Sequence, residues 1–325
     1  MSTELSNEFI REWNDFLERE KERQIITIAH NPSLSKILSD TFGYQPYYQI
    51  IKSEGINIGV FPGMLFRGKL ISMPHFSYGG PLFKDGYLSK QIQFIKDLSY
   101  QYEVRSFSKL SEYYSDKKVG SILGLKQNIE EQWSSIKSKR RSQINSGYRH
   151  SPLIKVGKGD LLKDFYKVYS IHMHQLGSPS LPFTFFKNLV SCYEYGEVNI
   201  VGVYFNGACV SAGFKLSYMG FEEVCWASTL NEFSQYNFNM LLYWEMIKNS
   251  INQKNKYFSF GRSTRGSSNQ KFKKQWEPLE IQLYFNYSKN IKQSIDLQKL
   301  FSPIIKCLPL PVVNMTSKKI FKYLY

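Results

Sequence analysis

The chain has 325 residues, of which 42% are hydrophobic and 21% charged, and its formal net charge is +15. This length and composition predict a buried core in one large or two moderate domains and exclude a disordered chain. Its four cysteines lack CxxC spacing, and no run approaches the roughly 18 apolar residues of a membrane span. These features disfavour a zinc site, a disulfide framework and an integral membrane protein, while the positive charge favours an anionic partner.

The first half of the chain alternates helix and strand patterns. Apolar side chains at Phe9, Trp13 and Phe16 have helical spacing, which predicts a helix over residues 6–20 with Asn7 as its candidate cap. The patterns that follow predict a helix at 32–42, strands at 46–53, 56–66 and 69–74, a helix at 87–101, strands at 103–107 and 119–125, and a helix at 129–146.

After Gly147 a similar succession begins again. The patterns predict helices at 160–176 and 182–191, strands at 197–205, 208–218 and 221–229, a helix at 235–250, and strands at 256–260 and 279–287. The same order of elements thus occurs twice, which favours two similar halves of mixed sheet. A Lys-rich, proline-broken tail follows from Asp296, and we expect it to pack on the core rather than to lie on a membrane.

The segment around residues 256–276 is basic and aromatic. From Met246 to Trp276 there are eight Lys or Arg residues and no acid. Alternation up to Phe260 predicts a short strand that Gly261 ends. Arg262 and Ser263 are therefore expected at a strand terminus, where a guanidinium and a hydroxyl can hold an anion or a developing oxyanion.

A second segment, SYGGPL at residues 77–82, follows a predicted strand. Its paired glycines, Gly79 and Gly80, allow either close approach to a ligand or a simple corner, and Tyr78 could stack on a sugar ring. The five histidines show no metal-ligand spacing, so we expect no metal site. Glu222 and Glu223 adjoin on a strand and face opposite ways, unlike the carboxylate pair of a glycosidase.

FGRS at residues 260–263, followed by KFKKQW at 271–276, resembles the FGRS and FK motifs of FemABX-type transferases, a branch of the GNAT superfamily. Further matches in the family's order are WNDFL, HNP, FGY, GVFP, LISMPHFSYGGPL, LKQNIEEQWSSIKSKRRSQI, HQLGSPSLPFTFF, FNMLLYW and LPLPVVN. The resemblance covers most of the chain. It implies a mixed α/β (α+β) fold of tandem GNAT-like domains over 1–147 and 148–290, the second with the active site, and a helical tail over 291–325.

The resemblance also implies an acyl or aminoacyl transferase that forms an amide on a cell-envelope precursor, either a peptidoglycan peptide or a surface-polysaccharide amino sugar. Lys273 stands at the lysine of the FK motif and would neutralise the oxyanion or a substrate phosphate. Arg262 would clamp a carboxylate or phosphate in bidentate fashion. The candidates for substrate binding are Ser263, Tyr78, Gly79, Gly80, Asn239 and Tyr243.

The donor is the remaining question. An acyl-CoA-dependent GNAT enzyme normally holds the pyrophosphate on a Q/R-x-x-G-x-G/A loop at a helix N-terminus. The corresponding segment here, EFSQYNFNMLLYW, has no glycine. We therefore expect no tightly bound cofactor and a donor such as aminoacyl-tRNA or another anionic acyl carrier, with acyl-CoA as the alternative.

The sequence also leaves alternative functions open and predicts a location for the protein. One alternative is an acyl-CoA-dependent N-acyltransferase of polysaccharide biosynthesis, and another is a non-catalytic protein that binds tRNA or a polyanionic glycan. No secretory signal pattern begins the sequence, which predicts a cytoplasmic protein with at most peripheral contact with the inner face of the membrane. We expect no DNA partner.

Overall fold

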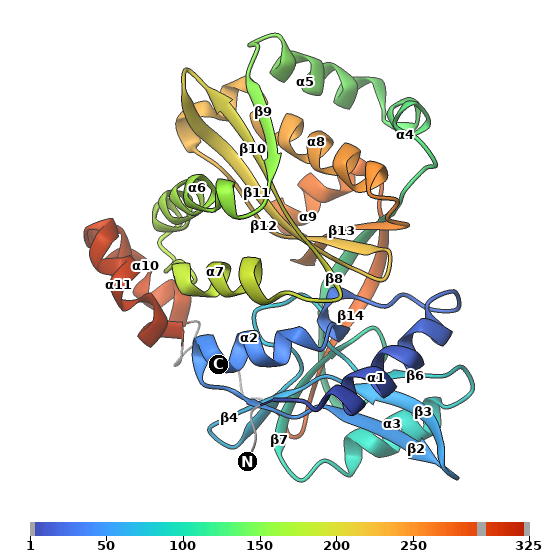
Figure 1. Ribbon diagram of the computed structural model, residues 1–325. Helices are drawn as coiled ribbons and strands as arrows, with labels where there is room; N and C mark the ends of the chain where they lie inside the picture. Colours follow the sequence, from blue (N-terminus) through green and yellow to red (C-terminus); the bar gives the residue numbers. More distant parts are fainter. Residues whose placement is uncertain (1–3, 291–296, 322–325) are drawn as a thin grey trace. The chain divides into compact units, whose positions relative to one another are not determined.

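The computed structural model describes residues 4–290 and 297–321 (Figure 1). The chain divides into two compact units. Unit 1 comprises Met1–Leu123, Glu194–Gly196 and Ser259–Gln293, and unit 2 comprises Gly124–Tyr193, Glu197–Phe258 and Ser294–Tyr325. None of the helices in the described ranges has the length and apolarity needed to cross a bilayer.

The larger sheet of unit 1 contains strands from both ends of the chain. Its order is β1 (Gln45–Pro46), β4 (Met64–Phe66), β5 (Lys69–Ile71), β7 (Gln101–Ser106), β14 (Leu279–Tyr287), β8 (Tyr113–Gly124) and β13 (Tyr257–Thr264). The pairs β1–β4, β4–β5, β7–β14 and β8–β14 are antiparallel, and β5–β7 is parallel. A smaller antiparallel sheet contains β2 (Gln49–Ser53), β3 (Ile56–Phe61) and β6 (Leu82–Phe83).

Because of this pairing, the bounds of the compact units differ from those of the predicted segments 1–147, 148–290 and 291–325. Because β14 lies between β7 and β8, residues 259–293 belong to unit 1 rather than to a C-terminal body. That each half of the sequence is a GNAT-like domain stays a prediction.

The helical elements of unit 1 are α1 (Asn7–Glu20), η1 (Ile28–His30), α2 (Ser33–Phe42), α3 (Leu88–Lys96), α9 (Ser268–Lys273) and η4 (Lys274–Trp276). The Ser6 hydroxyl caps α1 by accepting from the Phe9 N–H at 3.2 Å, so Asn7 was the wrong cap. The apolar face of α1 buries Trp13, whose indole N–H donates to the carbonyl of His30 at 2.8 Å. This bond fixes His30 in the interior of the unit.

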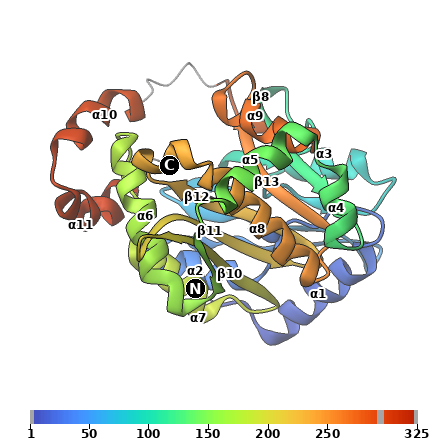
Figure 2. The same cartoon turned by 90° about the horizontal axis from the view of Figure 1, so that it is seen from above.

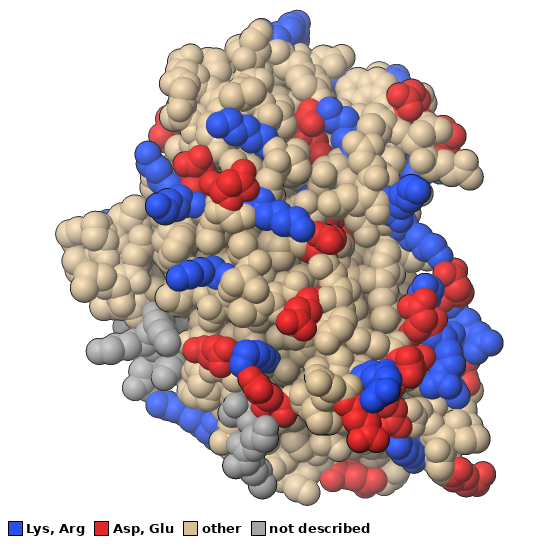
Figure 3. Space-filling model, viewed as in Figure 1, with Lys and Arg blue, Asp and Glu red and all other residues tan. Residues whose placement is uncertain are grey.

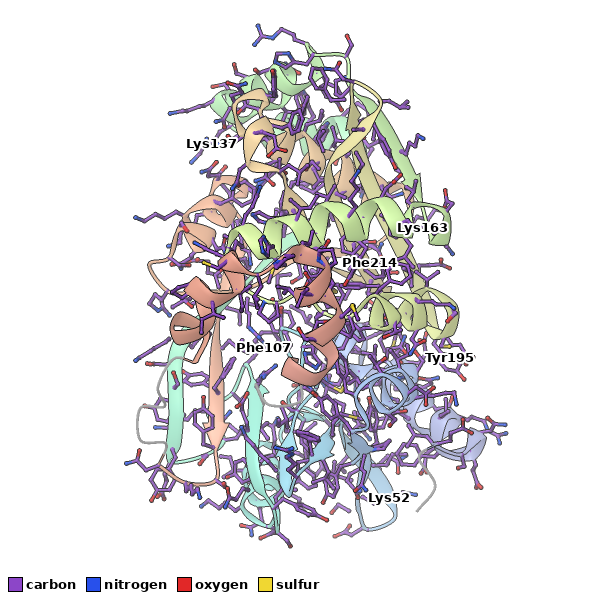
Figure 4. All side chains as sticks on the ribbon, turned by 90° about the vertical axis from the view of Figure 1, so that its left-hand side faces the viewer. Lys52, Phe107, Lys137, Lys163, Tyr195 and Phe214 are labelled. Carbon is purple, nitrogen blue, oxygen red and sulfur yellow. The ribbon has the colours of Figure 1, made fainter. Side chains whose placement is uncertain are left out.

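Unit 2 is built on the strands β12 (Phe221–Thr229), β11 (Ala208–Tyr218), β10 (Gly196–Phe205) and β9 (Leu153–Gly157), in that order. Phe214 on β11 packs on Phe165 of α6 (Leu162–Gln175) and on Phe186 of α7 (Phe183–Cys192). Lys215, which points to the other face, bonds the carbonyl of Met246 on α8 (Phe238–Asn252). Helices therefore cover both faces of this sheet, and Figure 4 labels Phe214 beside α6.

The remaining elements of unit 2 are α4 (Ile129–Ser135), α5 (Ser138–Tyr148), η2 (Gly159–Leu161), η3 (Asn231–Tyr236), α10 (Leu297–Cys307) and α11 (Leu310–Phe321). Helix α5 packs on α8, and α10 and α11 pack on α6. Figure 2 shows α10 and α11 beside α6.

The predicted fold class, a mixed fold with a mainly antiparallel sheet flanked by helices, is confirmed. Several element bounds differ. The single helix expected at 129–146 is two helices, because the backbone is extended at Ile136 and Lys137. The strand expected at 56–66 is β3 and β4, since Pro62 and Gly63 interrupt it, and β9 and α9 were not predicted.

Candidate functional site

Arg262 lies inside a strand rather than at its end. The predicted strand end at Phe260 is wrong, because Gly261 adopts a φ of 70° and β13 continues to Thr264. A positive φ suits glycine and lets the strand kink without stopping. The Arg262 guanidinium donates to the Phe76 carbonyl at 2.6 Å, and the Arg262 N–H donates to the Ser77 hydroxyl at 3.2 Å. Arg262 thus holds the loop that precedes Gly79 and Gly80.

Lys273 and Arg262, the two predicted catalytic residues, lie together in unit 1. Helix α9, capped by the Ser267 hydroxyl, carries Lys273 in its last turn. The Lys273 side chain is 8% exposed, and its ammonium donates to the Arg262 carbonyl at 2.8 Å. Both cations are therefore in protein surroundings rather than in bulk solvent, and a charge there is screened less than one at the surface.

Arg105 is a third cation at this place and was missed in the sequence. It is 2% exposed, and its guanidinium donates to Glu103 at 2.7 Å and to the Phe76 carbonyl at 3.0 Å. The Arg105 and Arg262 guanidiniums lie 5.2 Å and 5.6 Å from the ring centroid of Phe285. The sequence contains a local sign of the Glu103–Arg105 ion pair, since these opposite charges are two residues apart and share one face of a predicted strand.

The pKa values of neighbouring groups reflect the positive charges of Arg105 and Arg262. Burial, with Arg105 and Arg262, lowers the pKa of His75 to about 3. Burial lowers the pKa of Lys118, and the positive charges of Arg262 and Arg105 lower it further. Burial alone would raise the pKa of Glu103, but Arg105 and Lys69 lower it to about 2. The two guanidiniums thus produce a positive potential that would stabilise a bound anion or a developing oxyanion.

A cavity of about 420 Å³ lies beside this cluster, within unit 1. Its walls include His30, residues 78–86, Leu88, Arg105 and Ser106. The imidazole of His30 lies 3.2 Å from the Gly80 carbonyl and 3.1 Å from the Thr27 hydroxyl. Burial lowers the pKa of His30 to about 4, so a neutral imidazole and a buried guanidinium face one space.

Comparisons with known proteins show what the chain is similar to. Residues 137–274 match the family model for an acetyltransferase (GNAT) domain. The crystal structure of FemX superposes with a TM-score of 0.65 at 13% identity, over 93% of this chain and 99% of that one. Residues 137–274 therefore match a GNAT domain, and the chain has the fold of FemX.

A second solved structure, L-PGS from Bacillus licheniformis, has a TM-score of 0.55 at 12% identity, over 92% of this chain and 97% of that one. At such identities the likeness shows the fold alone. No curated protein matches the chain in sequence. Of the candidate residues, Arg262, Ser263, Lys273, Asn239 and Tyr243 fall inside the segment that matches the GNAT domain.

The SYGGPL loop lies at the cavity and is closely packed. Tyr78 is 2% exposed, its hydroxyl lies 3.0 Å from the Ser259 hydroxyl, and its ring packs on Phe107, which Figure 4 labels. A Cβ on Gly79 would meet the Met73 Cβ at 2.8 Å, and a Cβ on Gly80 would meet the Ser106 Cβ at 2.6 Å. The glycines therefore have a packing role, and contact of these three residues with substrate stays a prediction.

Ser263 on β13 carries a buried hydroxyl. It is 4% exposed, and its hydroxyl has no hydrogen-bond partner among the described residues. A buried hydroxyl without a partner costs free energy, so this atom is suited to bind a group that arrives with a ligand. Its role in substrate binding stays a prediction.

Asn239 and Tyr243 are half-buried on α8 in unit 2. The Thr229 hydroxyl donates to the Asn239 side-chain carbonyl at 3.5 Å, and burial raises the pKa of Tyr243. Before α8 the chain forms η3 and a left-handed Asn237 with a φ of 58°. No glycine occurs between Asn231 and Asn237. This segment therefore lacks the residue type that lets a backbone approach a pyrophosphate.

Proposed function

We propose that this protein is a FemAB-like GNAT acyltransferase that forms an amide on an amine of a cell-envelope precursor, either a peptidoglycan peptide or a surface-polysaccharide amino sugar. The observation that carries the proposal is the cluster of Arg105, Arg262 and Lys273 behind the SYGGPL loop and its cavity. Charge of this kind supports a reaction whose transition state carries an oxyanion, and also a substrate that carries phosphate or carboxylate.

The chemistry is acyl transfer. The acceptor amine attacks the carbonyl carbon of an activated ester, a C–N bond forms, and the carbonyl oxygen becomes an oxyanion. The ester C–O bond then breaks, and the proton lost by the amine goes to the leaving hydroxyl. Such a step asks the protein to orient two substrates and to stabilise charge. Lys273 and Arg262 would supply the charge, and Ser263 would supply a hydrogen bond to the substrate.

Aminoacyl-tRNA is the donor that the features favour. The segment before α8 lacks glycine, which disfavours a CoA pyrophosphate loop. From Trp133 to Lys158 the sequence, which includes all of α5, has no acid, and such a surface suits a polyanionic carrier. Acyl-CoA is the second candidate, because the matching family model describes an acetyltransferase. Both donors, and the precursors, place the reaction in the cytoplasm.

The test is a matrix of donors and acceptors. The purified protein is incubated with aminoacyl-tRNA or acyl-CoA, each with peptidoglycan or amino-sugar precursors, and the amide is sought by mass spectrometry. We expect amide from one donor class only, and Arg262→Ala and Lys273→Ala to reduce it. Arg265→Ala and Lys271→Ala, at exposed positions of the same segment, are the controls. Absence of amide in every combination would contradict the proposal.

A further inference from the structure

The C-terminal helices carry an apolar surface that faces away from the protein. Ile304, Leu308, Val312 and Met315 are 54%, 40%, 43% and 84% exposed. Ile304 lies on α10, Leu308 between the two helices, and Val312 and Met315 on α11, so the four residues surround the link that joins the helices. We refer to these four residues as the tail patch. Elsewhere among the described residues, exposed large apolar side chains occur singly or in pairs, such as Leu153 and Val156 on β9.

The opposite side of the same helices is docked on the protein. Ile305, Val313 and Ser317 are 7%, 2% and 0% exposed. His174 of α6 lies 2.8 Å from the Leu308 carbonyl, and a Cβ on Gly177 would meet the Ser302 hydroxyl at 2.1 Å. These contacts and Figure 2 place α10 and α11 firmly against α6. The tail patch therefore stays exposed to solvent although the helices that carry it are docked.

The charge of residues 297–325 indicates which kind of partner the tail patch could bind. Residues 297–325 contain no acid and five lysines, namely Lys299, Lys306, Lys318, Lys319 and Lys322. Lys306 is exposed on α10. In the view of Figure 3 the α10–α11 region is almost entirely free of charged side chains. Exposed apolar side chains beside the exposed Lys306, in a segment whose sequence has no acid, fit an anionic lipid surface, where the apolar groups enter the interface and the Lys306 ammonium meets a lipid phosphate.

A second copy of the chain fits less well. A two-fold contact would bring the same lysine-rich segment of two molecules together, and like charges repel. We propose that the tail patch docks the protein on an anionic membrane surface. This proposal is independent of the acyl donor and of the acceptor.

Vesicle binding tests the proposal. The full chain is sedimented with vesicles of phosphatidylcholine alone and of phosphatidylcholine mixed with phosphatidylglycerol. We expect binding to the mixed vesicles only, and weaker binding as salt increases. Replacement of the tail patch by serine (I304S, L308S, V312S and M315S) should weaken binding about tenfold or more, and Lys306→Glu should weaken it too.

The control is I56S with L153S, which removes two exposed apolar side chains of similar exposure, 59% and 58%, from other elements. It should bind as the parent chain does. Thermal unfolding of each variant shows whether it is folded. Two results would overturn the proposal: no binding of the parent chain to the mixed vesicles, or equal binding by the folded tail-patch variant. Sedimentation velocity would show whether the patch instead joins two copies, which would overturn it as well.

Discussion

Arg262 and Lys273 each hold neighbouring backbone in place and carry a charge that we propose acts in the reaction. Each donates to a backbone carbonyl, Arg262 to Phe76 and Lys273 to Arg262 itself. These bonds link β13, α9 and the SYGGPL loop, and they restrict the positions of two positive charges. Because the bonds leave the charges in place, one residue can both order the loop and stabilise an oxyanion.

Gly80 provides a residue-scale prediction about the loop. In Gly80→Ala the new Cβ would lie 2.6 Å from the Ser106 Cβ and 2.9 Å from the Ser106 Cα, so the loop or β7 must shift. We expect the free energy of unfolding to fall by about 1–3 kcal/mol. Gly124→Ala is the matched control, because its Cβ meets nothing within 4 Å. Chemical denaturation measures both, and equal effects would contradict the packing argument.

His30 provides a prediction about pH. Burial lowers its pKa from 6.5 to about 4, so below pH 6.5 the unfolded chain binds a proton that the folded chain does not. The stability present above pH 6.5 is therefore lost progressively as the pH falls to about 4, by at most about 3 kcal/mol. Denaturation at several pH values should show a smaller loss in His30→Gln. His150→Gln, at an exposed position, should leave the loss unchanged.

At the scale of elements, the sheet of unit 2 encloses a buried ion pair. Lys215 and Glu222 are both 0% exposed and lie 2.8 Å apart. The other donors of the Lys215 ammonium reach the Met246 carbonyl at 3.0 Å and the Asn249 side chain at 2.8 Å. The pair thus fixes α8 on β11 by polar contacts inside an apolar layer.

We expect Lys215→Met to destabilise the protein by about 3–5 kcal/mol, because it leaves the Glu222 carboxylate buried without its cation. The double variant K215M with E222L should lose much less, since no buried charge remains. Lys158 pairs with Glu197 at the surface, where both side chains are more than half exposed, so Lys158→Met should cost less than about 1 kcal/mol. A double variant as unstable as Lys215→Met would argue against this account.

The elements also show what the sequence could predict. Apolar runs and turn signals predicted β14, β11 and β12 at their observed bounds and β10 to within one residue, because glycines such as Gly207 and Gly220 punctuate those runs. They did not predict that β14 pairs between β7 and β8, since pairing between residues so far apart leaves no local signal. The spacing of Glu103 and Arg105 gave a local sign of their ion pair, but the bond from Arg105 to the Phe76 carbonyl, 29 residues away, has no such sign.

At the scale of the whole molecule, the net charge of +15 has a measurable consequence. If the donor is tRNA, several phosphates are neutralised on binding, and the apparent affinity falls steeply with salt concentration. We expect the Michaelis constant for aminoacyl-tRNA to rise by about tenfold or more between low and physiological salt. A Michaelis constant independent of salt would argue against a polyanionic donor.

The central claim is that the charge of Lys273, beyond its hydrogen bond, promotes amide formation. Lys273→Gln keeps an N–H donor for the Arg262 carbonyl and removes the charge, and Lys271→Gln removes a charge from an exposed neighbour. The measurement is the single-turnover rate of amide formation with the donor and acceptor that the parent protein uses. We predict a loss of about 10²–10³-fold in Lys273→Gln and almost none in Lys271→Gln. A folded Lys273→Gln protein that reacts at the parent rate would contradict the account.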